Sequence, residues 1–123
     1  MIKESIEFRV RYAETDQMGF VYYGNYAQYF EIGRVEALKK VGISYRNLEE
    51  SGIMLPVKDL HIEYKQAAKY DDLIKVTTTI HEMPSNRIVF DYIIERGETI
   101  LVTGKTTLFF MNKEGRPIRP SQE

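Results

Sequence analysis

Residues 23–42 read YGNYAQYFEIGRVEALKKVG, and this stretch carries the clearest helical pattern in the chain. Apolar or small side chains recur there at spacings of three and four, which is the period of one helical face. They are Tyr26, Phe30, Gly33, Ala37 and Val41. Polar side chains, including Glu31 and Arg34, fill much of the remainder, and Gly42 suits the left-handed residue that often follows a helix. The stretch predicts one long amphipathic helix over about residues 23–41.

The segment just before this helix, residues 13–22, places Glu14 and Asp16 beside Gly19 and an apolar run. The ordinary role of a loop aspartate is to accept hydrogen bonds from nearby backbone N–H groups. The apolar run can also desolvate a carboxylate, and the free N–H groups at a helix start can bind a developing oxyanion. The segment therefore suggests hydrolysis of an activated acyl group by one of these acids, and it leaves both the acid and the substrate open.

Alternating apolar and polar residues predict five strands. The first covers residues 6–12, and the other four follow the helix at about 59–65, 74–80, 88–94 and 99–111. A short helical turn is expected near residues 44–51, with strand connections at 83–86 and 96–98. Short connections make neighbouring strands antiparallel. The order predicts an α+β domain in which one long helix covers one face of an antiparallel sheet.

The composition narrows the possible classes of protein. A length of 123 residues suggests one domain, residues 1–123, and a formal net charge of -1 argues against nucleic-acid binding. The chain has no cysteine and only two histidines, so we expect neither a thiolate nucleophile nor a metal site. There is no signal-like N-terminus and no apolar run of about 18 residues, so we expect no membrane association and a cytoplasmic location.

The stretch RYAETDQMGFVYYGNYAQYFEIGRVEAL, residues 11–38, resembles the signature of the 4-hydroxybenzoyl-CoA thioesterase family of the hot-dog superfamily. Its motif, D-x-x-G-x-V-Y-x-x-N-Y, falls on Asp16, Gly19, Val21, Tyr22, Asn25 and Tyr26. The likeness continues through GIMLPVKDLHIEYKQAAKYDDLIKVTT, residues 52–78, and covers nearly the whole chain. The resemblance implies a hot-dog fold, in which five antiparallel strands wrap around one long helix.

The same resemblance implies an acyl-CoA thioesterase, which hydrolyses an acyl-CoA to a carboxylic acid and free CoA. Asp16 matches the catalytic carboxylate, which acts as nucleophile or as general base toward water, and the backbone N–H of Tyr23 matches the group that polarises the thioester carbonyl. The implied substrate-binding residues are Gly19, Val21, Tyr22, Gly24, Asn25, Tyr26 and Arg87. Gly24 departs from the family pattern, because many relatives carry histidine or proline there.

The family further implies a homodimer or homotetramer with its active sites at the dimer interface. It implies no cofactor, because the thioester is already activated and CoA is part of the substrate. Two alternatives are an acyl-carrier-protein thioesterase and a non-catalytic hot-dog protein that binds acyl-CoA. A hydratase or dehydratase on this fold is disfavoured, because such enzymes usually pair an acid with a histidine and no histidine lies near Asp16 in the sequence.

Several other residues could take part in chemistry, but an ordinary structural role is the first interpretation of each. Glu14 is expected to be a loop charge, and Glu31 a solvated or capping acid on the helix. His61 and His81 are expected at the surface. Four tyrosines fit an acyl pocket and the protein core about equally well: Tyr22, Tyr23, Tyr26 and Tyr29.

Overall fold

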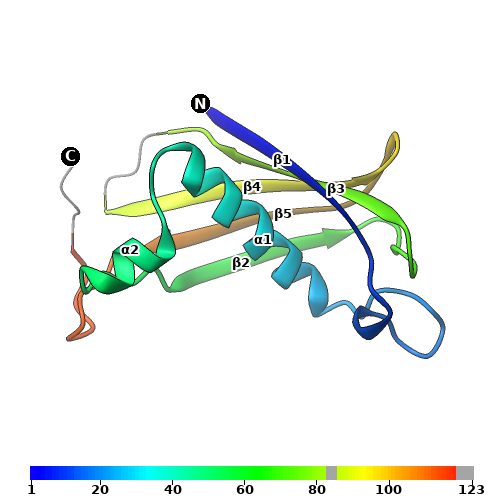
Figure 1. Cartoon of the computed structure of the whole chain (residues 1–123), viewed down its shortest axis with the longest axis horizontal. Helices are drawn as coiled ribbons and strands as arrows, with labels where there is room; N and C mark the ends of the chain where they lie inside the picture. Colours follow the sequence, from blue (N-terminus) through cyan, green and yellow to red (C-terminus); the bar gives the residue numbers. More distant parts are fainter. Residues whose placement is uncertain (83–85, 119–123) are drawn as a thin grey trace.

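The computed structural model describes residues 1–82 and 86–118. In chain order, its elements are β1 (Ile2–Arg9), the short 3₁₀ helix η1 (Tyr12–Glu14), α1 (Asn25–Lys40), α2 (Tyr45–Glu50), β2 (Val57–Tyr64), β3 (Leu73–Ile80), β4 (Arg87–Arg96) and β5 (Thr99–Phe109). The strands form one antiparallel sheet in the order β1-β3-β4-β5-β2, and α1 lies across one face of it (Figure 1). The α+β architecture predicted from the sequence is confirmed.

The apolar face of α1 packs against the sheet and forms the core with it. Phe30 is fully buried, and its ring stacks on Tyr92 of β4 with 4.2 Å between the ring centroids. This close approach needs a glycine in β5, because a Cβ on Gly104 would lie 2.4 Å from the Phe30 ring. Burying a side chain of this size stabilises the fold by roughly 2–3 kcal/mol. The helix is therefore held at a fixed position above the sheet.

The first strand is shifted from its predicted range, since β1 covers Ile2–Arg9 rather than residues 6–12. Glu4 breaks the apolar alternation on the inner face, where its carboxylate lies 3.3 Å from the Lys40 ammonium at the end of α1. After Arg9 the chain leaves the strand, and Tyr12 begins η1 with 78% of its surface exposed. Residues 2–5 were missed because Glu4 interrupts the apolar alternation, and its ion pair with Lys40 cannot be recognised from the local sequence.

The long helix begins two residues later than the sequence pattern predicts. Tyr22 and Tyr23 form a turn in which their carbonyl groups accept the N–H groups of Asn25 and Tyr26 at 2.9 and 3.3 Å. Gly24 is the residue that caps α1. At the other end, Gly42 follows the helix with φ +80°, as its place in the sequence predicts.

Two further expectations concern turns and membranes. Residues 97 and 98 join β4 to β5, as predicted, whereas most of the turn expected at 83–86 lies outside the described residues. Among the helices in the described ranges, none is both long and apolar enough to cross a membrane.

Candidate active site

The loop between η1 and α1 holds the Asp16 carboxylate in one orientation. Its Oδ1 accepts the N–H groups of Met18 at 2.9 Å and Phe20 at 3.2 Å, and its own N–H donates to the Phe20 carbonyl at 2.7 Å. Gly19 lies inside this turn with φ +82°, a conformation that costs glycine little and other residues about 1–2 kcal/mol. Gly19 therefore makes the turn possible, and the turn orients Asp16.

The other carboxylate oxygen of Asp16, Oδ2, accepts no hydrogen bond from any residue in the described ranges. Asp16 is exposed, so the desolvation that the sequence suggested does not occur within one chain. The reason is that Val21 turns into the core, with 5% of its surface exposed, while Tyr22 points outward. One chain supplies an oriented carboxylate with a free oxygen, and a dry environment has to come from the substrate or from another chain.

The turn before α1 presents two adjacent N–H groups, those of Tyr23 and Gly24. Neither has an acceptor among the residues that the structure describes, although the neighbouring N–H groups of Tyr22 and Asn25 are both bonded. Unpaired N–H groups at the positive end of a helix are suited to stabilising negative charge on an oxygen. They lie on the same loop as Asp16, which is the arrangement predicted for thioester chemistry.

A second loop, residues 66–72, supports the Asp16 loop from behind. The N–H of Val21 donates to the Ala68 carbonyl, and the N–H of Tyr70 donates to the Gly19 carbonyl, both at 2.9 Å. The Tyr26 hydroxyl accepts the N–H of Ala68 at 3.0 Å. Burial raises the pKa of Tyr26, which is only 2% exposed, so this tyrosine stays neutral within the core. Val21 and Tyr26 thus lie beneath the site and not on its surface.

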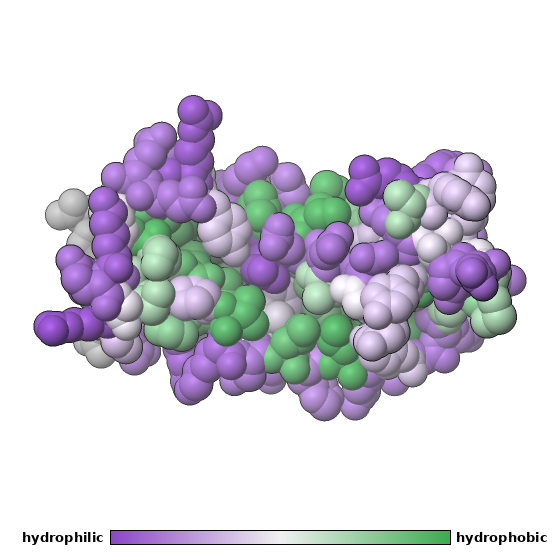
Figure 2. All heavy atoms as spheres, turned by 90° about the horizontal axis from the view of Figure 1, so that it is seen from below, coloured by the Kyte–Doolittle hydropathy of each residue, from purple (hydrophilic) through white to green (hydrophobic). Residues whose placement is uncertain are grey.

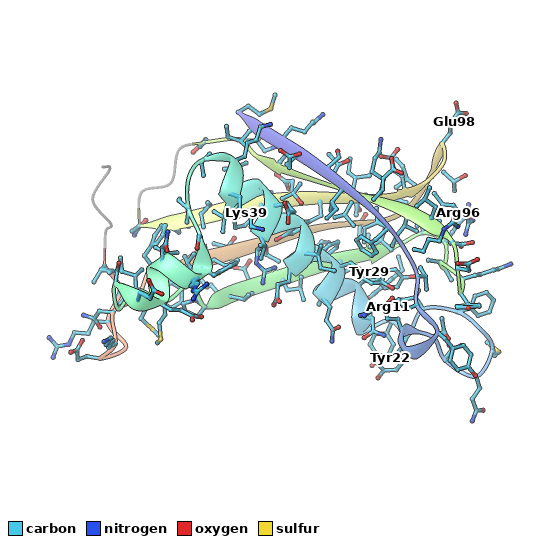
Figure 3. The ribbon with its side chains drawn as sticks, viewed as in Figure 1. Arg11, Tyr22, Tyr29, Lys39, Arg96 and Glu98 are labelled. Atoms are coloured by element: carbon cyan, nitrogen blue, oxygen red, sulfur yellow. The ribbon has the colours of Figure 1, made fainter. Side chains whose placement is uncertain are left out.

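The four tyrosines, which fitted a pocket or the core equally, divide between the two roles. Tyr26 and Tyr29 are buried, whereas Tyr22 and Tyr23 are 52% and 63% exposed. The exposed pair is in contact, with 4.8 Å between ring centroids, and Tyr64 at the end of β2 lies 6.5 Å from Tyr23. Figure 3 shows Tyr22 at the α1 start and Tyr29 farther along the helix. An exposed aromatic surface therefore adjoins the two free N–H groups.

Glu14 is not the loop charge that we expected, because the structure buries it and surrounds it with donors. Its Oε1 accepts the backbone N–H of Arg11 at 2.8 Å and the Tyr29 hydroxyl at 2.9 Å, while Oε2 accepts the Arg11 guanidinium at 3.0 Å. Burial tends to raise the pKa of Glu14, but these donors outweigh it and hold the pKa below its usual value. Position 11 is not the Ser or Thr of a capping box, and Tyr29 is 15 residues away from Glu14, so no local sequence signal identifies this role.

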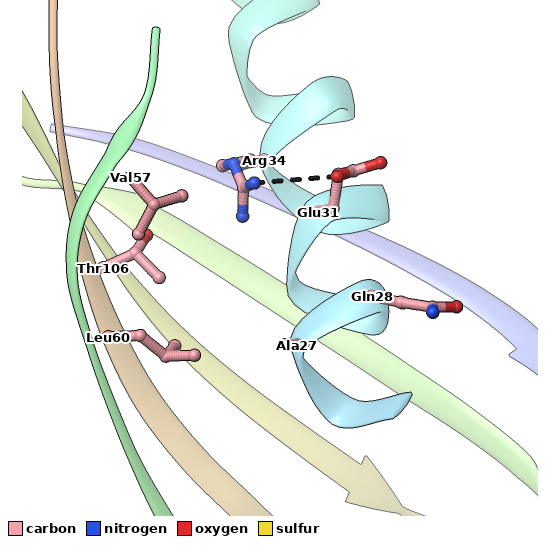
Figure 4. A pocket seen from close by; sticks show the side chains of 7 residues that line it. All are labelled: Ala27, Gln28, Glu31, Arg34, Val57, Leu60 and Thr106. Carbon is pink, nitrogen blue, oxygen red and sulfur yellow. Dashed lines mark ion pairs between the residues drawn. The ribbon is translucent and has the colours of Figure 1, made fainter. Parts of the chain in front are cut away.

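Arg34, which the helical pattern placed on the polar face, is also buried, with 7% of its surface exposed. Its Nε donates to the Tyr45 hydroxyl at 3.0 Å, and a terminal nitrogen lies 3.9 Å from the carboxylate of Glu31. Glu31 itself is exposed, as expected. The two side chains line a pocket of about 190 Å³ between α1 and the edge of β2 (Figure 4). Its lining residues are Ala27, Gln28, Glu31, Arg34, Val57, Leu60 and Thr106.

The remaining predicted site residues lie in different places. Asn25 begins α1, and its side-chain amide donates to the Glu14 carbonyl at 2.8 Å. Arg87 is exposed at the start of β4, at the opposite end of the sheet from the Asp16 loop (Figure 1). One chain therefore does not bring Arg87 to Asp16. His61 and His81 are exposed as expected, and the described residues contain no group of three metal-ligating side chains.

Comparison with known proteins assigns the family. A model of the thioesterase-like superfamily matches residues 10–123. The acyl-CoA thioesterase YbgC of Haemophilus influenzae is 37% identical over 98 residues, which are 79% of this chain and 72% of that protein. YneP of Bacillus subtilis is 41% identical over 86 residues, and the match spans 70% of this chain and 62% of that protein's length.

A solved structure agrees with these sequence matches. The crystal structure of a DHNA-CoA thioesterase from Staphylococcus aureus superimposes with a TM-score of 0.90 at 39% identity, over 97% of this chain and 81% of that one. The hot-dog resemblance stated from the sequence is thereby confirmed. On the match over residues 10–123 and on this shared fold, the chain belongs to the thioesterase-like superfamily.

Proposed function

We propose that this protein is an acyl-CoA thioesterase, which hydrolyses an acyl-CoA thioester to a carboxylic acid and free CoA. The observation that carries this proposal is the Asp16 carboxylate, with one oxygen fixed by two backbone N–H groups and the other free. The unpaired N–H groups of Tyr23 and Gly24 on the same loop support it, as does the acyl-CoA thioesterase activity named for the YbgC relative.

In the proposed reaction, the thioester carbonyl oxygen lies against the N–H of Tyr23, which stabilises the negative charge that develops there. Asp16 either attacks the carbonyl carbon itself, forming a mixed anhydride that water then hydrolyses, or accepts a proton from a water molecule that attacks the carbon. In both routes the carbon–sulfur bond breaks, and CoA leaves as a thiolate that takes up a proton. The reaction needs no metal or redox cofactor, because a thioester is already activated.

The other proposed contacts follow from where the residues lie. Tyr22 and Gly24 border the free N–H groups, and Gly19 lies in the turn that holds Asp16; all three are proposed to contact the acyl group or the CoA arm. Val21, Tyr26 and Asn25 serve the substrate site indirectly, because their hydrogen bonds hold the loop and the helix start in place.

We also propose that the active unit is at least a homodimer joined through β2. This strand is the last in the sheet order, so one of its edges is unpaired, and nearly all of its residues are exposed. Figure 2, a view from the β2 side, shows apolar atoms gathered on this face. The exposed apolar side chains of β2 are Val57, Leu60 and Tyr64. A long exposed edge with apolar side chains favours pairing with another strand.

Antiparallel pairing of two β2 strands gives a twofold dimer with one continuous sheet. The end of one chain that carries the Asp16 loop then lies at the same end of the sheet as the β4 start of the other chain. Arg87 of the partner subunit is thereby available to a CoA nucleotide bound near Asp16. The pocket beside Arg34 becomes part of the interface, which supplies the dry environment that one chain lacks.

The dimer proposal predicts that Leu60→Glu separates the subunits and removes most of the activity. A charge at this position opposes burial against a second β2, because an unpaired buried carboxylate is costly. Analytical ultracentrifugation should show a dimer or larger for the wild type and a monomer for the variant. Ile100→Glu is the control, because Ile100 is as exposed as Leu60, at 41% against 44%. Ile100 lies on β5 near the β4–β5 turn, away from the free edge of β2. A wild-type monomer that is fully active contradicts the proposal.

The proposed activity is tested by measuring thiol release from a panel of short, long and aromatic acyl-CoAs. The protein contains no cysteine, so released CoA is the only thiol in the assay. We expect turnover with at least one member of the panel. A parallel arm with acyl-carrier-protein thioesters separates the two kinds of thioesterase. Binding without release in both arms contradicts the proposed function and favours a binding protein.

A further inference from the structure

Glu14 is a buried, ionised side chain that the proposed reaction does not use directly. It is 9% exposed, and its two oxygens accept hydrogen bonds from the Arg11 backbone, the Arg11 guanidinium and the Tyr29 hydroxyl. Burial raises the pKa of Tyr29, and the bond to Glu14 raises it further, so Tyr29 stays protonated as a donor. The bond between Glu14 and Tyr29 links η1 to the second turn of α1.

The main chain of Glu14 makes a second connection to the same helix. Its carbonyl accepts the backbone N–H of Tyr22 at 2.9 Å and the side-chain amide of Asn25 at 2.8 Å. These two donors flank Tyr23 and Gly24, whose N–H groups are free. One residue thus fixes both sides of the proposed oxyanion site.

Glu14 is also only two residues from Asp16. Thr15, the residue between the two acids, pairs with Val21 in an isolated antiparallel bridge, and Val21 leads into the helix start. A shift of Glu14 therefore moves Asp16 relative to the Tyr23 N–H. We infer that Glu14 is a positioning residue for the proposed thioester hydrolysis, which holds the carboxylate of Asp16 and the free N–H groups of Tyr23 and Gly24, just before α1, at a working separation. This inference rests on the proposed function.

The test compares Glu14→Ala with Glu14→Gln. Glutamine keeps one carbonyl oxygen that can accept both the Arg11 N–H and the Tyr29 hydroxyl, whereas alanine removes every side-chain bond. A misplacement of about 1 Å can lower a catalytic rate about 100-fold. We expect kcat to fall roughly 10- to 100-fold in Glu14→Ala with KM changed less than about 3-fold. Glu14→Gln should recover most of the rate, and Tyr29→Phe should lie between the two.

Loss of stability alone has to be separated from loss of position. Ile80→Ala is the control, because Ile80 is buried at the end of β3, opposite Ile2 of β1, and has no part in the proposed substrate site. It should lower the melting temperature without lowering kcat in the folded protein. Amide hydrogen exchange at Tyr22 adds a readout that needs no substrate: the exchange should accelerate in Glu14→Ala and not in Ile80→Ala.

The outcomes distinguish this inference from the proposed function. A wild type that releases no CoA from any substrate refutes the proposed function, and the exchange at Tyr22 still decides whether Glu14 holds the helix start. An active wild type together with an equally active Glu14→Ala refutes the positioning role alone. Equal loss of kcat in Glu14→Ala and Glu14→Gln also refutes it, because the charge and not the position would then matter.

Discussion

Asp16→Asn is expected to lower kcat on the order of 10²- to 10⁴-fold, the range that a catalytic base usually supplies. The fold should be unchanged, because the asparagine carbonyl oxygen can accept the same N–H groups of Met18 and Phe20. What the variant loses is the free oxygen Oδ2, which becomes an amide nitrogen without an electron pair to donate. Steady-state thiol release, with substrate binding measured separately, should show lost turnover and retained affinity.

The matched control for this variant is Asp71→Asn. Asp71 is another exposed loop aspartate, and its backbone has φ 67°, a conformation that asparagine tolerates. The control removes the same charge from a neighbouring loop, so it reports any general electrostatic effect on a CoA substrate. Activity retained in Asp16→Asn would move the chemistry to another carboxylate and would remove the main support for the proposed mechanism.

Much of this arrangement follows from local sequence. The helix period, the strand alternation and the turn residues predicted the α+β architecture, and Gly42 has the positive φ that its position after the helix predicts. The Asp16 loop could be proposed as a candidate site because it combines an acid, a glycine and a helix start within ten residues. These signals are local, so one sequence is enough to read them.

The parts that could not be predicted depend on residues far apart in the chain. Arg34 is buried because its guanidinium donates hydrogen bonds to Tyr45 of α2 and Tyr92 of β4, and no pattern within α1 predicts those partners. Glu14 is buried because Tyr29 reaches back to it from the helix. Tyr26 and Tyr22 have the same chemistry, and only the packing of the 66–72 loop places one inside and the other outside.

The contact between α1 and β3 leads to a second large effect, at Gly33. Replacing a helical glycine by alanine normally stabilises a helix by up to about 1 kcal/mol. Here we expect the opposite, because a Cβ on Gly33 would lie 2.4 Å from Thr78 Oγ1 and 2.9 Å from Val76 Cγ1. The neighbours cannot withdraw easily, since β3 is paired with strands on both sides. Gly33→Ala should lower the free energy of unfolding by about 1–3 kcal/mol, measured by urea denaturation.

A double-mutant cycle with Thr78→Ala tests the physical cause. Thr78 Oγ1 is buried and has no hydrogen-bond partner in the part of the chain that the structure describes, so removing it breaks no bond and opens space for the new methyl group. The double variant should therefore be more stable than the sum of the single effects by at least about 0.5 kcal/mol, as residues in contact commonly show. A stabilising Gly33→Ala, or strict additivity, would mean that α1 lies farther from the sheet. Because the turn that presents the Tyr23 N–H leads directly into α1, the same close contact also helps to set the height of the proposed oxyanion site above the sheet.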